Sequence, residues 1–315
     1  MNLSSLQLLN VFDNVLAGHI PDSLGQLRSL TYLALDENKL SGLIPPSLYN
    51  LSSITVFTMS RNELSGSLPS NLFLTLPHVQ RFLIYENQFT GSLPVSLSNA
   101  SELEYLEVGV NNFTGKISVN FGGLHRLEEL LIEDSNLGSG DDDDEMNFFQ
   151  SLINCSSLKV IDLSMNQLES TLPNVLGNLS TQLSFFGISE TLIFGEIPIG
   201  MGNLVNLTTL ILDDNKFSGT IPDEITGLKK LQRLYLNNNR LSGMLPITLG
   251  NLTSLNELRL GSNKLQGTIP SSIENCQNLL LLDLSQNNLS GIIPKQLFAI
   301  STLSIGLYLA QNLFM

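Results

Sequence analysis

The 315-residue sequence contains no tryptophan, two cysteines and few cationic side chains. Two cysteines are too few for the disulfide-dense scaffolds in which covalent bridges replace a hydrophobic core. The sequence has 15 Lys and Arg residues and 29 Asp and Glu residues, so the formal net charge is −14. This balance argues against a binder of nucleic acid or anionic membranes, which needs a basic face. The longest strongly apolar run, Leu279–Leu282, is far shorter than the roughly 18 residues of a membrane span.

The chain consists of a repeat with a period of 24 or 25 residues, apart from one interval of 31 residues. Residues 231–254, LQRLYLNNNRLSGMLPITLGNLTS, follow the plan LxxLxLxxNxLxGxIPxxLGxLxx. A unit of this size cannot bury an apolar face alone, so such units fold as stacked arrays. Thirteen units, the last one cut short, start at Leu6, Leu30, Ile54, Val79, Leu103, Leu127, Leu158, Leu183, Leu207, Leu231, Leu255, Leu279 and Ser304.

Each position that recurs from repeat to repeat has a structural role. The alternation in LxxLxLxx predicts a short strand with one face toward the core and the other toward solvent. Stacking these strands in parallel would bury each inward Leu against its equivalents in the neighbouring units. The Gly of the L-x-G step, as in Gly42 and Gly219, suits a turn with positive φ. The Pro that follows, as in Pro45 and Pro222, is expected to end a second strand and open the outer turn.

The ninth position of the unit is Asn in eleven of the thirteen units. A buried Asn amide can donate two hydrogen bonds to backbone carbonyls that are left unpaired where the chain leaves the strand. Ser135 and Thr191 replace Asn in the other two units, and we expect each hydroxyl to donate one bond. The predicted ladder consists of Asn14, Asn38, Asn62, Asn87, Asn111, Asn166, Asn215, Asn239, Asn263, Asn287 and Asn312.

The L-x-G-x-IP step resembles the plant-specific class of leucine-rich repeats over essentially the whole chain. The sixth unit carries an insertion, NLGSGDDDDEMNFFQSLINCSSL (136–158), and the seventh has an extra residue in GNLSTQL (177–183). That pair resembles the extracellular region of plant receptor-like kinases of the immune pattern-recognition subfamily. The fold class is therefore expected to be an α/β repeat solenoid, a plant-type horseshoe with a parallel concave sheet and no caps. We expect one domain over residues 1–315, with an acidic loop at 138–150.

The resemblance implies a fragment of a ligand-binding ectodomain on the extracellular face of the plasma membrane. Its parent would bind a peptide or protein ligand in defence or developmental signalling, recruit a co-receptor kinase, and carry a membrane helix and a kinase domain. The first 20 residues contain no Lys or Arg, so we expect this chain to lack a signal peptide and to be truncated. Two alternatives stay open: a secreted inhibitor resembling polygalacturonase-inhibiting proteins, and a non-functional truncated gene product.

Outward-facing strand positions provide the candidate binding surface. One expected cluster mixes Arg81 with Tyr85 and Tyr105, side-chain types that are enriched at binding hot spots, and a second joins Arg233, Tyr235 and Arg259. Acidic residues between them would favour a basic partner. The candidate ligand-binding residues are Tyr32, Arg81, Leu83, Tyr85, Tyr105, Glu107, Glu129, Glu133, Phe185, Asp213, Arg233, Tyr235 and Arg259.

Other motifs have mainly structural interpretations. Cys155 and Cys276 lie five units apart, so we expect two separate buried thiols. The acidic run 141–145 lacks the spaced ligands of a calcium loop and is expected to be a solvated loop. We expect no cofactor, no metal and no catalytic site, because the three His residues have no recurring nucleophilic partner. Nine sequons suit glycosylation, at Asn2, Asn50, Asn99, Asn112, Asn154, Asn178, Asn206, Asn251 and Asn288.

Overall fold

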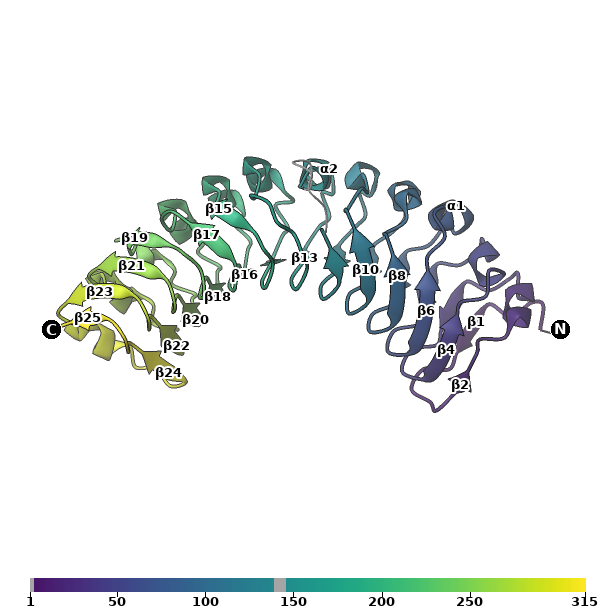
Figure 1. Cartoon of the computed structure of the whole chain (residues 1–315), viewed down its shortest axis with the longest axis horizontal. Helices are drawn as coiled ribbons and strands as arrows, with labels where there is room; N and C mark the ends of the chain where they lie inside the picture. Colours follow the sequence, from purple (N-terminus) through teal and green to yellow (C-terminus); the bar gives the residue numbers. More distant parts are fainter. Residues whose placement is uncertain (1–2, 139–145) are drawn as a thin grey trace. The chain divides into compact units, whose positions relative to one another are not determined.

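The computed structural model describes residues 3–138 and 146–315 of the chain. Two compact units are formed, Met1–Gln167 and Leu168–Met315. Thirteen strands, one from each repeat, run parallel to their neighbours, as predicted. Apart from the last, shortened repeat, each repeat continues from this inner strand through a turn and, in most repeats, a short second strand to a short helix on the opposite side (Figure 1).

In the first unit the inner strands are β1 (Leu8–Asn10), β3 (Tyr32–Ala34), β5 (Val56–Thr58), β7 (Arg81–Leu83), β9 (Tyr105–Glu107), β11 (Glu129–Leu131) and β13 (Val160–Asp162). A second, six-stranded parallel sheet lies beside them, formed by β2 (Ala17–Gly18), β4 (Lys39–Leu43), β6 (Glu63–Ser67), β8 (Gln88–Gly91), β10 (Asn112–Gly115) and β12 (Asn136–Leu137). The outer helices are η1 (Asp22–Gln26), η2 (Leu48–Asn50), α1 (Leu72–Thr75), η3 (Val95–Asn99), η4 (Phe121–Gly123) and α2 (Phe148–Leu152).

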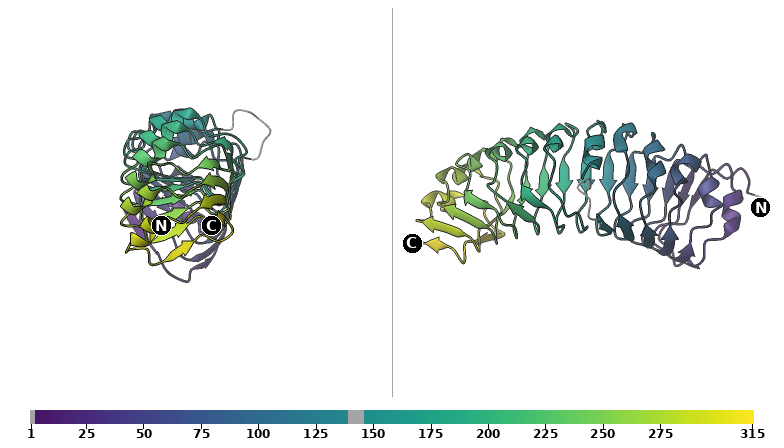
Figure 2. Two further views of the ribbon diagram at one scale, coloured as in Figure 1. Left: turned by 90° about the vertical axis from the view of Figure 1, so that its left-hand side faces the viewer. Right: turned by 45° about the horizontal axis from the view of Figure 1, so that its top comes forward.

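The second unit repeats this plan. Its inner strands are β14 (Phe185–Gly187), β16 (Thr209–Ile211), β18 (Arg233–Tyr235), β20 (Glu257–Arg259), β22 (Leu281–Asp283) and β24 (Gly306–Tyr308). The second row divides into β15 (Phe194–Glu196) with β17 (Lys216–Ser218), and β19 (Ser242–Met244) with β21 (Lys264–Gly267), β23 (Asn288–Gly291) and β25 (Leu313–Phe314). The outer turns are η5 (Asn174–Asn178), η6 (Ile199–Asn203), η7 (Asp223–Gly227), η8 (Leu249–Asn251), η9 (Ser271–Asn275) and η10 (Lys295–Ala299). The rotated views of Figure 2 show these short helices following one another along one side of each unit.

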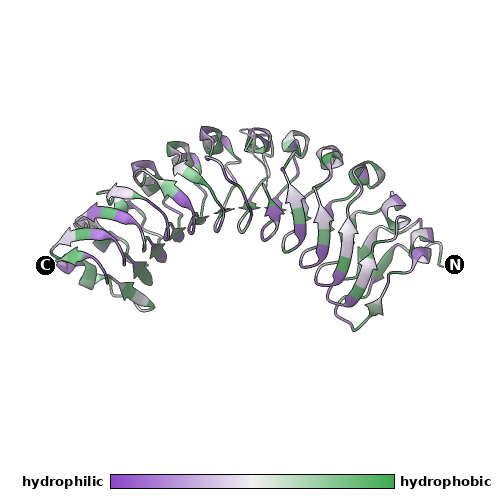
Figure 3. Cartoon of the chain, in the orientation of Figure 1, coloured by the Kyte–Doolittle hydropathy of each residue, from purple (hydrophilic) through white to green (hydrophobic). Residues whose placement is uncertain are grey.

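The inward side chains form a continuous apolar core because the strands pair without a shift in register. Leu33 on β3 lies opposite Phe57 on β5, which lies opposite Phe82 on β7. The rings of Phe57 and Phe82 stack with centroids 5.4 Å apart, and both residues are fully buried. Leu234 in the second unit is also buried, whereas Tyr85 and Tyr235 keep access to solvent, as the alternation requires. The change between apolar and polar residues along the chain is visible in Figure 3.

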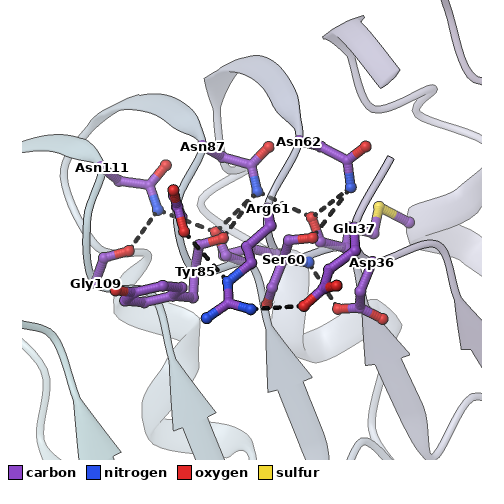
Figure 4. A network of polar contacts seen from close by, with 12 residues as sticks. Asp36, Glu37, Ser60, Arg61, Asn62, Tyr85, Asn87, Gly109 and Asn111 are labelled. Atoms are coloured by element: carbon purple, nitrogen blue, oxygen red, sulfur yellow. Dashed lines mark hydrogen bonds and ion pairs between the residues drawn. The ribbon is translucent and has the colours of Figure 1, made fainter. Parts of the chain in front are cut away.

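The asparagines of the ninth position connect each repeat to the one before it. The Nδ2 of Asn111 donates to Val108 O and Gly109 O within its own repeat, each at 3.0 Å, and to Ile84 O of the preceding repeat at 3.0 Å. Its Oδ1 accepts the N–H of Phe89 at 2.9 Å. Asn62 and Asn87 make the same set of contacts, and Figure 4 shows the three amides in a row. One amide thus satisfies backbone groups from two repeats.

The two replacements at the ninth position behave differently. Thr191 donates from its hydroxyl to Oδ1 of Asn215 at 2.6 Å and so joins the neighbouring asparagine. Ser135 Oγ is buried and has no hydrogen-bond partner among the described residues, so the bond expected there is not formed.

The residue just before the ninth position has an unexpected backbone conformation. In all thirteen repeats it is a non-glycine residue with φ between 48° and 56°. This left-handed turn lets its N–H reach the next repeat, as in Val110 N to Glu133 O at 2.9 Å. Val110 is the β-branched member of the set, for which the conformation is especially unfavourable. The predicted positive φ at Gly42 and Gly219 is also present, at 77° and 76°.

Prolines begin most of the outer turns. Pro222, for example, has an extended backbone with φ −61° immediately before η7, and its carbonyl accepts the N–H of Ile225 at 3.2 Å. The ring fixes φ near this value, and the N–H that proline lacks is not needed there.

Part of the insertion in the sixth repeat folds as α2, whose Phe149 and Leu152 are buried. Phe148–Gln150 of the range expected to be an acidic loop are helical, and the acidic run 141–145 lies outside the described residues.

We predict that Asn111→Ala lowers the free energy of unfolding by about 3 kcal/mol, because it removes the contacts of the amide with three carbonyls and leaves the N–H of Phe89 without its acceptor. Asn14→Ala is the matched control: Asn14 is exposed and its Nδ2 donates only to Val11 O and Phe12 O of its own repeat. Its cost should stay below about 1 kcal/mol. Urea unfolding measures both values, and equal costs would contradict a connecting role for the ladder.

We also predict that Val110→Asn raises the free energy of unfolding by about 1 kcal/mol, because Asn tolerates the left-handed conformation better than a β-branched residue. Val205→Asn makes the same chemical change at an exposed position outside the positive-φ set and should give no gain. A shift in the urea midpoint of similar size for both variants would show that polarity, not backbone conformation, is responsible.

Candidate functional site

Solvent-facing residues of the inner strands in the first unit, and of the turns that follow these strands, surround a groove of about 700 Å³. Its lining includes six of the candidates from the sequence, namely Tyr32, Arg81, Leu83, Tyr85, Glu107 and Glu133. The strand alternation places them here because the third, fifth and seventh residues of each repeat point away from the Leu core. The lining residues outside the candidate set are Phe12, Asp36, Glu37, Val56, Thr58, Ser60 and Arg61.

Arg61 was not among the candidates, yet it connects three repeats across the groove. Its Nη1 lies 2.6 Å from Glu37 Oε1, and its Nε lies 3.3 Å from Glu86 Oε2. The guanidinium also lies 6.0 Å from the centre of the Tyr85 ring (Figure 4). Glu37, Arg61 and Glu86 all occupy the eighth position of successive repeats, so alternating charge at that position could have revealed the network.

Polar contacts also hold the floor of the groove near Asp36. Its Oδ1 accepts the backbone N–H of Ser60 at 2.7 Å, and its Oδ2 accepts the hydroxyl of Thr58. Both partners belong to the next repeat, so the carboxylate cannot turn freely into the groove. The Asp36 side chain is therefore held in place on the floor of the groove.

Arg81 and Tyr105 form a stacked pair at the edge of the groove. The Arg81 guanidinium lies 4.4 Å from the Tyr105 ring centre, a close cation–π geometry. The Tyr105 hydroxyl donates to Glu128 Oε2 at 3.0 Å, and Lys159 donates to the same oxygen at 2.8 Å. The Lys159 ammonium, together with this phenol, lowers the pKa of Glu128. The predicted first cluster is thus brought together, with Glu128 and Lys159 as supports that the sequence analysis missed.

Glu107 and Glu133 face the groove without a comparable cation. Oε2 of Glu133 is buried and has no hydrogen-bond partner among the described residues. Burial raises the pKa of Glu133 to about 7, and the charges of Asp162, Glu107 and Asp134 act in the same direction. Burial also raises the pKa of Glu107, aided by Glu129 and Asp36 and opposed by Arg61.

A glycine makes room for the Glu133 carboxylate. A Cβ atom at Gly109 would lie 2.7 Å from the Glu133 carboxyl carbon and 2.8 Å from its Oε2. Gly109 precedes the left-handed Val110 and lies beside Tyr85 in Figure 4. The carboxylate therefore occupies the space that a side chain at position 109 would fill.

The second predicted cluster also forms, within the second unit. The Arg259 guanidinium lies 4.5 Å from the Tyr235 ring centre and donates from Nη2 to Glu257 Oε2 at 2.9 Å. The Tyr235 hydroxyl donates to the same oxygen at 2.6 Å, and Arg233 Nε lies 3.9 Å from Oε1. Both carboxylate oxygens of Glu257 are thus engaged by side chains of this cluster. A smaller hollow of about 300 Å³ is lined by Arg259, Leu281, Asp283 and Tyr308.

The remaining candidates lie outside these clusters. Glu129 on β11 lies opposite Tyr105 on β9 and is half-buried. Phe185 on β14 lies opposite Thr209 on β16 and is half-buried. Asp213 has a buried Oδ1 without a hydrogen-bond partner among the described residues, and burial raises its pKa. None of the three lines the groove of the first unit.

Both cysteines are buried free thiols. Burial raises the pKa of Cys155 to about 12 and that of Cys276 to about 11, so both stay protonated and unreactive at neutral pH. Within residues 3–138 and 146–315, no group of three or more His, Cys, Asp or Glu side chains is placed to hold a metal ion. No helix in this described part of the chain is long and apolar enough to cross a membrane.

The sequons of the described residues differ in accessibility. Asn206 is half-buried; its Nδ2 donates to Thr181 O and its Oδ1 accepts from Lys230, both at 2.6 Å. Asn2 lies outside the described residues. The exposed sequon asparagines lie in or next to outer turns and second-row strands, at Asn50, Asn99, Asn112, Asn154, Asn178, Asn251 and Asn288.

Two family profiles match parts of the chain. The leucine-rich repeat region profile matches residues 142–282, and the leucine rich repeat profile matches residues 29–51 and 278–299. Among curated proteins, receptor kinase-like protein Xa21 of Oryza sativa subsp. japonica is 44% identical over 96 residues, which cover 30% of this chain and 9% of Xa21.

Solved structures of plant receptors resemble the chain over nearly its full length. A TDR receptor is 31% identical with a TM-score of 0.91, and the match covers 99% of this chain and 52% of the receptor. The Arabidopsis receptor kinase HAESA, solved with the peptide hormone IDA and the co-receptor SERK1, is 29% identical with a TM-score of 0.67. That match covers 99% of this chain and 58% of HAESA, so the chain spans about half the length of these receptor structures.

We predict that Glu133→Gln stabilises the protein at pH 8 but not at pH 5. The pKa of Glu133 is about 7 in the folded state and near 4.5 when unfolded. Ionised Glu133 therefore lowers the free energy of unfolding, and this loss of stability grows as the pH rises from 4.5 to 7. After allowance for solvent screening, the gain at pH 8 should be about 1–2 kcal/mol. Unfolding at both pH values measures it. Glu63→Gln, at an exposed carboxylate on β6, is the control, and an equal pH effect there would contradict the assignment.

Proposed function

Because this chain is a leucine-rich-repeat protein homologous to plant receptor kinases and receptor-like proteins, we propose that it is part of a ligand-binding ectodomain. The chain recognises a peptide or protein ligand through its inner strands and the adjoining lateral surface. Recognition serves defence or developmental signalling. The parent protein works at the extracellular face of the plasma membrane, and the repeats themselves catalyse no reaction.

The observation that carries this proposal is the groove of the first unit. Its volume of about 700 Å³ lies within the range of small-ligand sites and accommodates several side chains of an extended peptide. Tyr32, Tyr85 and Arg81 are side-chain types that dominate binding energy at interfaces. Arg81 already stacks on Tyr105, and Tyr85 lies 6.0 Å from the Arg61 guanidinium, so binding would cost these two side chains little entropy.

The position of the exposed sequons supports the same surface. They lie in or next to outer turns and second-row strands, and none lies on an inner strand within the described residues. Glycans at these asparagines would cover the outer and one lateral side while leaving the groove accessible. The complex of HAESA with a peptide hormone and SERK1 supports a peptide ligand and a co-receptor kinase as the partners of the parent protein.

We predict that dodecapeptides selected from a random phage-displayed library on the immobilised chain lose at least about tenfold in affinity for the triple variant Arg81→Ala, Tyr85→Ala, Tyr105→Ala. The reason is that these side chains supply the aromatic and guanidinium anchors of the groove and its edge. Fluorescence anisotropy with synthetic copies of the selected peptides measures the loss.

The control is a triple variant of exposed side chains outside the inner strands, Leu74→Ala, Arg126→Ala, Phe298→Ala, which should change affinity less than about twofold. Equal affinity of the peptides for both triple variants would place the contact elsewhere and overturn the proposal. A selection that yields no binding peptide would also overturn peptide recognition by this surface.

A further inference from the structure

The charges in the groove are unevenly compensated. Arg61 already pairs with Glu37 and Glu86, and Arg81 stacks on Tyr105 at the edge. Glu107 and Glu133 are left without a salt-bridge partner among the described residues. A buried carboxylate oxygen without a donor is costly, and proteins usually pair such an atom.

The surroundings of Glu133 contain acids and one aromatic ring. Glu107 on β9, Asp134 in its own repeat and Asp162 on β13 all act on it electrostatically with the same sign. Its charge in turn reaches the phenol of Tyr85, whose ring lines the same groove. Two carboxylates beside an aromatic face form an environment that stabilises an ammonium or guanidinium group.

The Glu133 carboxylate is positioned by the backbone, not left to move on the surface. It lies against Gly109, where any larger residue would displace it. Gly109 O accepts a bond from Asn111 of the ladder, so this wall of the groove is tied to the core of the unit. A preorganised carboxylate of this kind binds a cation without losing side-chain entropy.

We propose that the groove of the first unit binds a lysine or arginine side chain of the ligand, with the Glu107 and Glu133 carboxylates as counter-charges and the Tyr85 ring as the flanking wall. This inference rests on the proposed function and specifies the chemistry of its ligand. The bound cation approaches the Glu107 and Glu133 carboxylates from the groove that both residues line. It also favours the ionised carboxylate, so binding strengthens as the pH rises through the titration range of Glu133.

The test uses two fluorescein-labelled dodecapeptides of Gly, Ser and Tyr that differ only in carrying three Lys or three Glu residues. We expect the Lys peptide to bind the chain at pH 8 and the Glu peptide not to bind. Glu133→Gln should weaken Lys-peptide binding about tenfold and Glu107→Gln several-fold. Glu63→Gln lowers the net negative charge equally but lies on β6, so its effect should stay below about twofold.

Gly109→Ala separates position from charge. It keeps the net charge, but its Cβ would lie 2.7 Å from the Glu133 carboxyl carbon and 2.8 Å from Glu133 O, so the carboxylate must move and Lys-peptide binding should weaken as strongly as in Glu133→Gln. Binding by the wild-type chain should also weaken between pH 8 and pH 5.5, and Glu133→Gln should abolish most of this dependence. Circular dichroism checks that each variant is folded, and Glu107→Gln carries the test if Glu133→Gln is not.

Equal weakening by Glu133→Gln and Glu63→Gln would show attraction to the net charge alone and would overturn the inference. Failure of the inference is distinguishable from failure of the proposed function. Library-selected peptides that lack Lys and Arg, depend on Arg81, Tyr85 and Tyr105, and are indifferent to Glu133→Gln would leave the binding surface in place while removing its cation specificity.

Discussion

The hydrogen bonds of the ninth-position asparagines are the constraint on which the rest of each unit depends. One amide satisfies carbonyl groups in its own repeat and in the preceding repeat, while its oxygen accepts a backbone N–H at the start of the preceding second strand. An isolated repeat could satisfy only part of this set, because half of the partners belong to its neighbour. The array is therefore stable only as a stack, which is the usual physics of repeat proteins.

This ladder also determines where the outward-facing side chains lie. Because successive strands pair in register, the same position of each repeat returns at the same height, about 4.8 Å from the last. Charges at the eighth position can then meet across three repeats, as Glu37, Arg61 and Glu86 do. The scaffold fixes the backbone, and the outward side chains carry the charges and rings that meet between repeats. Function in such a fold lies in those side chains, not in the fold itself.

The regular stack also contains backbone conformations that cost free energy. The residue before each asparagine adopts a left-handed backbone without being glycine, and at Val110 the residue is β-branched. Hydrogen bonds to the next repeat, such as Val110 N to Glu133 O, over-determine the conformation, so side chains of several kinds accept it. The groove carries a second cost, the crowding of the Glu107 and Glu133 carboxylates, which a core built for stability alone would not contain.

The sequence by itself determined the repeat, the parallel inner strands, the buried Leu and Phe positions and the turn glycines, because each follows from a pattern within a single 24-residue unit. It also placed the aromatic and Arg candidates on the solvent-facing side, since side-chain direction alternates along a strand. The tertiary structure alone decided which of them meet. The Arg61 network, the support of Tyr105 by Glu128 and Lys159, the unpartnered Ser135 and the fit of Glu133 against Gly109 depend on contacts between different repeats. Such contacts are governed by side-chain rotamers and by distances across the stack, and neither can be read from the spacing of residues along one chain.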